Sequence, residues 1–214
     1  TVILISQILV KLLGAVYRMV ITNVDGFGDQ GNGLYTVGFQ IYTLLLAISS
    51  VGIPNAISKM TSERIALNDY KGAHKIFRTA MLLFTVIGSV SAVILFAGSD
   101  FFAKAIHYPR SASIMRALAP SLLFVCVSSV IRGYFTGMKN MRATSNSQVL
   151  EQVFKCTLTI VFVYASSILI ADSNPEKTPA MATWANFATT SATVLSMLYL
   201  FYLFVLLLKG ETQV

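Results

Sequence analysis

Val-Ile-Leu-Ile-Ser-Gln-Ile-Leu-Val-Lys-Leu-Leu-Gly-Ala-Val-Tyr-Arg-Met-Val-Ile-Thr, residues 2–22, is the stretch of sequence that decides the fold. It is mostly apolar, and as a helix it is about long enough to cross a hydrocarbon core of roughly 30 Å. Further apolar runs near or above this length follow at 34–60, 76–97, 117–138, 149–171 and 181–208. The sequence therefore predicts an all-α, multi-pass membrane helical bundle of about six transmembrane helices, with residues 1–214 as a single domain.

The composition supports a membrane location. Of the 214 residues, 55% are hydrophobic and only 12% are charged, and the mean hydropathy is +0.70. These values are too apolar for an ordinary soluble domain. A net charge of +7 in a soluble chain would suggest nucleic acid, but basic residues that flank membrane spans set topology instead. We therefore expect membrane lipids as neighbours and no nucleic-acid partner.

The basic residues also predict an orientation, because cytoplasmic loops carry an excess of Lys and Arg. Nine of them flank the loops after the second and fourth runs or follow the last run: Lys59, Arg64, Lys71, Lys75, Arg78, Arg132, Lys139, Arg142 and Lys209. Four flank the loops on the opposite side: Lys104, Arg110, Arg116 and Lys177. Both ends of the segment are thus expected in the cytoplasm, with Arg132, Lys139 and Arg142 in a cytoplasmic loop or gate.

Lys11 and Arg18 are the two basic residues inside the first apolar run, and their seven-residue spacing returns them to nearly one helix face. Gln7 and Gly14 extend this stripe. A cation near the middle of a span costs roughly 2.5 to 3.5 kcal/mol, so two on one stripe need water, a counter-charge or a ligand. The alternative is that Arg18 reaches the nearby membrane interface and Lys11 pairs with another helix.

A second polar stripe occurs at the start of the run at 149–171. Gln148, Glu151, Gln152 and Lys155 share one helix face by their spacing. Glu151 precedes Lys155 by four residues, the favourable order for an ion pair on a helix. The two residues are expected either to neutralise each other or to line a polar cavity, where they shape it or couple transport to an ion.

The second run, at 34–60, carries a helix-breaking sequence in its interior. Gly52 is followed by Pro54, and a proline inside a helix removes one hydrogen bond and clashes with the preceding turn. A kink or break is therefore expected. Such a break can serve a transporter as a hinge, but prolines are also simply commoner in membrane helices than in soluble ones.

The residues that commonly support catalysis or metal binding are scattered. Cys126 and Cys156 fall inside predicted spans and are expected to be small core residues rather than disulfide partners. His74 and His107 lie in separate predicted loops on opposite sides, and the sequence has no cluster with metal-ligand spacing. We therefore expect neither an enzyme nor a bound metal or cofactor.

Several motifs, taken together and in order, resemble one family of bacterial membrane proteins. After the fourth run the chain reads Arg132-Gly-Tyr-Phe-Thr-Gly-Met-Lys-Asn-Met-Arg-Ala-Thr-Ser-Asn-Ser-Gln-Val-Leu-Glu-Gln152. Earlier come Lys11-Leu-Leu-Gly14, Tyr17-Arg18, Gly31-Asn-Gly-Leu-Tyr35, Gly52-Ile-Pro-Asn-Ala-Ile-Ser-Lys59, Asp69-Tyr-Lys-Gly-Ala-His74 and Arg116-Ala-Leu-Ala-Pro120. The combination covers nearly the whole chain and resembles the stage V sporulation protein B and YtgP family of flippases.

This resemblance implies membership of the multidrug, oligosaccharidyl-lipid and polysaccharide exporter superfamily, which includes the MurJ lipid II flippases. Such proteins have two helical lobes around a central cavity, so six spans would form the amino-terminal lobe and a carboxyl-terminal lobe would be missing here. The resemblance also implies a bacterial cytoplasmic membrane and places Lys11 and Arg18 at positions thought to bind an anionic head group. The MurJ proteins carry a further arginine in the second helix, whereas the second run here has no basic residue before Lys59.

The leading functional hypothesis is a flippase for lipid-linked oligosaccharides or a peptidoglycan precursor, working by alternating access. Lys11 and Arg18 would bind the pyrophosphate, because fixed cations in a wet cavity can replace its hydration. One alternative is a cation-coupled multidrug exporter of the same superfamily that uses Glu151. Another is a membrane scaffold that transports nothing and would tolerate neutral residues in place of both Lys11 and Arg18.

Overall fold

The computed structural model describes the backbone of residues 2–50, 52–170 and 176–211, and the side chains of 8–47, 52–170 and 176–207. The described chain is helical, with a single short 3-10 turn, η1. The elements in order are α1 (Val2–Thr22), α2 (Gly28–Ser50), α3 (Ile53–Ala66), α4 (Tyr70–Ala105), η1 (Pro109–Ser111), α5 (Ala112–Gly137), α6 (Met141–Leu169) and α7 (Lys177–Glu211). The prediction of an all-α membrane bundle is confirmed.

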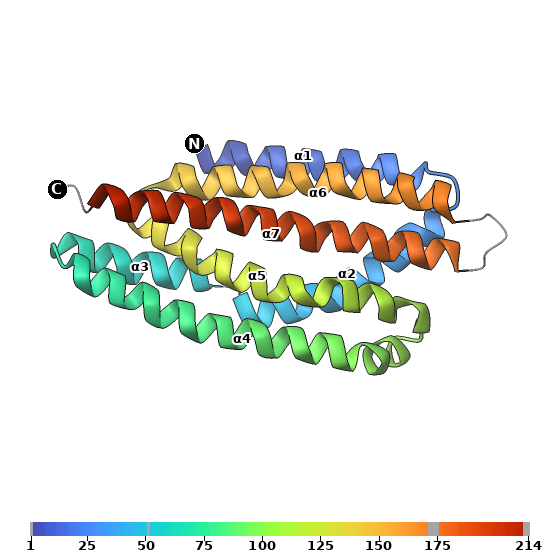
Figure 1. Cartoon of the computed structure of the whole chain (residues 1–214), viewed down its shortest axis with the longest axis horizontal. Coiled ribbons are helices and arrows are strands. Elements are labelled where there is room, and N and C mark those ends of the chain that lie inside the picture. The colour runs from blue at the N-terminus through green and yellow to red at the C-terminus, as the bar shows by residue number, and fades with distance from the viewer. Residues whose placement is uncertain (1, 51, 171–175, 212–214) are drawn as a thin grey trace.

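The helices lie roughly along one long axis (Figure 1). α1 and α6 run side by side in the same direction, and α5 lies between α4 and α7. The start of α1, the α3–α4 turn, the α5–α6 turn and the end of α7 gather at one end of the bundle (Figure 1). The loops that carry the larger basic group in the sequence therefore share one end, as the orientation prediction requires.

Four helices in the described part are long and apolar enough to cross a membrane by themselves. They comprise residues 70–105, 109–137, 141–169 and 177–207. Each extends at one or both ends beyond the apolar run that predicted it, because polar residues continue the helical turns. α6, for example, begins eight residues before 149 with Asn140 as its cap, whose side chain accepts a hydrogen bond from the Ala143 amide at 3.4 Å.

The second predicted span is two helices rather than one. α2 ends at Ser50 and α3 begins at Ile53. Gly52 has φ 90° and ψ −20°, in the left-handed region that glycine adopts at little cost. Pro54 lies in the first turn of α3, where a missing N–H leaves no helical bond unmade. The predicted break is confirmed, and one continuous span over 34–60 was wrong.

Two apolar clusters hold the bundle together. One joins α1, α2, α5 and α7 around residues such as Tyr35, Ile114 and Leu122. The other joins α3, α4, α5 and α7, where the rings of Phe77 and Phe204 stack with centroids 4.5 Å apart. Neither Cys126 nor Cys156 forms a disulfide, and both are buried, as the sequence predicts for core residues.

Candidate functional site

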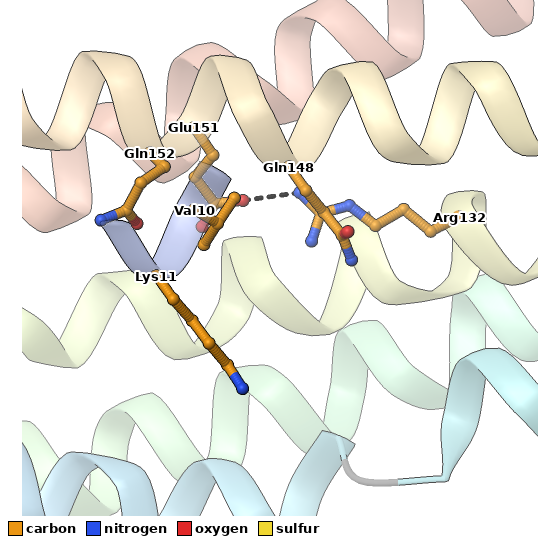
Figure 2. A pocket seen from close by; sticks show the side chains of 6 residues that line it. All are labelled: Val10, Lys11, Arg132, Gln148, Glu151 and Gln152. Carbon is orange, nitrogen blue, oxygen red and sulfur yellow. Dashed lines mark hydrogen bonds and ion pairs between the residues drawn. The ribbon is translucent and has the colours of Figure 1, made fainter. Parts of the chain in front are cut away.

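A pocket of about 270 Å³ lies where α1, α5 and α6 meet (Figure 2). Five of its six lining residues are polar or charged. Its lining residues are Val10 and Lys11 of α1, Arg132 of α5, and Gln148, Glu151 and Gln152 of α6. The structure thus brings one residue of the first polar stripe together with three of the second, as the cavity hypothesis expects.

Glu151 forms its ion pair with Arg132 and not with Lys155. The Glu151 carboxylate accepts a hydrogen bond from the Arg132 guanidinium at 2.5 Å, and the two side chains are only 25% and 13% exposed. The predicted pair with Lys155 was therefore wrong. Arg132 was also misplaced, because α5 continues to Gly137 and holds this residue inside the bundle instead of in a loop.

The ion pair is part of a network that joins three helices. Arg132 Nε donates to Ser147 Oγ of α6 at 3.0 Å, and its terminal nitrogen donates to Ser196 Oγ of α7 at 3.1 Å. Ser196 in turn donates to the Ser147 carbonyl at 3.0 Å. Thr193 Oγ1 contacts the second Glu151 oxygen at 3.5 Å. These contacts satisfy both buried charges, which would otherwise be costly at this depth.

Lys11 has no such partner. Among the described residues its ammonium makes no ion pair or hydrogen bond, and the side chain is exposed. Figure 2 shows it extending away from the Arg132–Glu151 pair, so it does not join the network. The alternative in which Lys11 pairs privately with another helix has no support in the described part of the chain.

Arg18 lies two turns further along α1 and contacts α2. Its guanidinium donates to Thr36 Oγ1 at 3.1 Å, and its central carbon lies 5.8 Å from the centroid of the Tyr35 ring. The Tyr35 hydroxyl is 3.2 Å from that of Tyr17. Arg18 is exposed and has no acidic partner among the described residues. It keeps guanidinium donors for a ligand.

Lys155 also lies among aromatic rings. Its ammonium is 4.6 Å from the centroid of Phe39 and 6.0 Å from that of Tyr17. Cations are attracted to ring faces at such distances. No carboxylate in the described part of the chain forms an ion pair with Lys155, because Glu151 is bound to Arg132.

The two polar stripes meet along the seam between α1 and α6. Gln152 Nε2 lies 3.4 Å from the position that a Cβ on Gly14 would occupy. The Cys156 thiol donates to the Leu13 carbonyl at 3.5 Å. Gln148 lines the same pocket as Lys11, and the side chain of Gln7 lies outside the described residues. These contacts place the middle of α1 directly against α6.

Lys139 and Arg142 lie away from the pocket at the α5–α6 turn. Both are exposed, and Lys139 has φ 61°, an uncommon left-handed conformation for a residue with a side chain. The predicted loop position is confirmed for Lys139 and was wrong for Arg142, which lies in the first turn of α6, while a role in a gate stays a prediction for both. Within the described residues no group of three His, Cys, Asp or Glu side chains is arranged to hold a metal ion.

Sequence reasoning missed the contributions of α7 and α2. Thr193 and Ser196 complete the polar network, and Phe39 and Tyr35 receive the two cations, yet all four look like ordinary residues of apolar helices. One clue was present for Arg132, since the predicted apolar run at 117–138 already includes this residue. The ring contacts depend on how the helices pack and have no local sequence pattern.

Comparison with known sequences identifies the family of this chain. Residues 1–209 match the family described as polysaccharide biosynthesis protein. The chain belongs to this family. No solved structure matches the chain.

Curated relatives from this group share a quarter to a third of aligned residues with the chain. "Lipid II flippase MurJ" of Bacillus subtilis (strain 168) is 29% identical over 75% of this chain and 30% of the relative. "Stage V sporulation protein B" of the same organism is 32% identical over 75% of the chain and 31% of the relative. "Probable lipid II flippase MurJ" of Rickettsia prowazekii (strain Madrid E) is 24% identical over 71% and 32%.

The chain thus matches less than a third of the length of these polysaccharide biosynthesis relatives. The family match and the four long apolar helices are those of a multi-pass membrane protein of this family. Two of these three names describe a lipid II flippase.

Proposed function

We propose that this chain is the amino-terminal lobe of a flippase for a lipid-linked saccharide with a diphosphate head group. The observation that carries the proposal is the pair of cations on α1. Lys11 and Arg18 lie in the first span expected from the sequence and have no acidic partner among the described residues, whereas the nearby Arg132 is ion-paired with Glu151. An anionic head group supplies the counter-charge that these two cations lack.

The two cations differ in what they offer a diphosphate. The Arg18 guanidinium is a planar fork suited to two phosphate oxygens, and the Lys11 ammonium is a point charge on a flexible stem. Seven residues of helix separate them by about 10 Å along the axis. They would replace the hydration of the head group while its sugars pass through the polar pocket beside Gln148 and Gln152.

Transport by alternating access requires a second lobe that rocks against this one. The chain matches less than a third of its relatives' length, so we propose that further helices of the same protein complete the cavity. The cation-coupled drug exporter is disfavoured by the Arg132–Glu151 pair, because that carboxylate already has a fixed cation. We place the protein in a bacterial cytoplasmic membrane with both ends of this segment in the cytoplasm.

The test is to replace Lys11 and Arg18 singly by alanine in the full-length protein and to measure head-group translocation at matched expression. We expect each substitution to reduce translocation at least tenfold, because a lost charge-assisted hydrogen bond is worth about 1.5–3 kcal/mol. Lys104→Ala, at an exposed lysine in the last turn of α4, serves as control and should change nothing. Full activity in both α1 variants would contradict the proposal and favour a scaffold.

A further inference from the structure

Lys155 lies where α1, α2 and α6 meet, beside the part of α1 that carries Lys11 and Arg18. Its ammonium sits over Phe39 of α2 and near Tyr17 of α1, although the residue itself belongs to α6. It is half-buried, and in the described part of the chain it has neither an ion pair nor a hydrogen bond. Ring faces compensate a half-buried cation only in part. The position is therefore suited to an additional anionic partner.

The contacts between helices place Lys155 between Lys11 and Arg18. Gly14 of α1 faces Gln152, and the Leu13 carbonyl receives the Cys156 thiol, so the middle of α1 is level with this part of α6. Lys11 lies before that level, where it shares the pocket with Gln148 and Glu151. The order along the seam is thus Lys11, then Lys155, then Arg18.

The aromatic residues of α2 support the same order independently. Arg18 lies over the Tyr35 ring and Lys155 over the Phe39 ring. These two rings are one helical turn apart and stack with centroids at 6.0 Å and an angle of 9°. The two cations therefore occupy adjacent places on one aromatic surface.

Glu151 does not neutralise this row of cations. It is the acidic residue one turn from Lys155 on the same helix, and Arg132 holds it at 2.5 Å while Thr193 of α7 contacts its other oxygen. Arg132 thus keeps Glu151 away from Lys155. The consequence is a row of three cations, from two helices, with no acidic partner among the described residues.

We propose that Lys155 is a third ligand for the lipid diphosphate, bound between Lys11 and Arg18. The inference rests on the proposed function of the two α1 residues and adds a binding residue on α6. One ammonium between two outer cations allows both phosphates of a diphosphate to be contacted at once. A single phosphate, as in an ordinary phospholipid, would use only part of this row.

The test uses the full-length protein in lipid nanodiscs and measures binding of undecaprenyl diphosphate, of lipid II and of phosphatidylglycerol. Lys155→Met is expected to lower the affinity for both diphosphate lipids at least tenfold and the affinity for phosphatidylglycerol by less than about threefold. Lys155→Arg keeps the charge, so its affinity for the diphosphate lipids should stay within about threefold of the wild-type affinity. An equal loss of affinity for phosphatidylglycerol would overturn the diphosphate assignment.

The same assay separates this inference from the function on which it rests. If Lys11→Ala and Arg18→Ala weaken diphosphate binding and Lys155→Met does not, the inference is wrong and the proposed function stands. If none of the three weakens binding, the proposed function itself is wrong.

A measurement on the wild-type protein covers the case in which Lys155→Met fails to fold. Bound undecaprenyl diphosphate should protect Lys155 from an amine-acylating reagent at least fivefold, read by peptide mass spectrometry, and should leave the exposed Lys104 equally reactive. Equal acylation of Lys155 with and without the lipid would overturn the proposal.

Discussion

At the scale of single residues, Arg132 and Glu151 make the shortest ion pair in the described bundle, at 2.5 Å. Both are poorly exposed, and each is the other's counter-ion. Breaking a fully buried pair costs about 3–5 kcal/mol, and this part-buried pair is expected to lose a share of that when one member is removed. We therefore expect Arg132→Met to lower the melting temperature strongly in a detergent unfolding assay.

The double variant Arg132→Met/Glu151→Gln should recover most of this loss, because no unpaired charge remains. The matched control is the exposed pair of Arg116 and Asp100, whose side chains are 46% and 60% exposed. Arg116→Met should change stability by no more than about 1 kcal/mol. If the double variant were as unstable as Arg132→Met, the ion pair would not be the reason for the loss.

At the scale of helices, the break between α2 and α3 depends on Gly52 and not on Pro54. Gly52 has φ 90°, which costs a residue with a side chain roughly 1–2 kcal/mol. Pro54 lies in the first turn of α3, where its ring fits and no hydrogen bond is lost. We expect Gly52→Ala to lower the melting temperature and Pro54→Ala to leave it nearly unchanged. The reverse ranking in thermal unfolding would contradict this assignment.

Elements of this fold were predictable where one helix alone determines them. The apolar runs predicted the helices, and Gly52 with Pro54 predicted the break, because both are local properties of the chain. Helix ends were less accurate. The polar segment from Met141 to Gln148 continues α6 through its cap and its packing on neighbouring helices, which apolar length does not reveal.

The site was predictable only in part, because its partners lie on different helices. Gln148, Glu151 and Gln152 share the pocket with Lys11, as the stripes predicted. The partner of Glu151 was not predictable from local sequence. Lys155 is close in sequence, but the packing of α5 on α6 brings Arg132 against the carboxylate.

At the scale of the whole molecule, the two ends of the bundle should lie on opposite sides of the membrane. Leu67, in the α3–α4 turn, is 73% exposed, and Tyr108, between α4 and η1, is 52% exposed. In whole cells a membrane-impermeant maleimide should label Tyr108→Cys. It should label Leu67→Cys only after the cells are permeabilised, because we expect the basic loops to be cytoplasmic. The buried Cys126 and Cys156 provide a low background, and labelling of Leu67→Cys in intact cells would reverse the orientation.

The central claim is that cations on α1 without acidic partners move an anionic lipid head group across the membrane. Its most direct test is the initial rate of lipid II translocation in proteoliposomes that contain the full-length protein, compared with the Lys11→Ala/Arg18→Ala double variant. The account predicts that the double variant loses at least 99% of the rate, because two charge-assisted contacts are removed together, while Lys104→Ala retains the wild-type rate. A double variant that translocates lipid II at the wild-type rate would contradict the account.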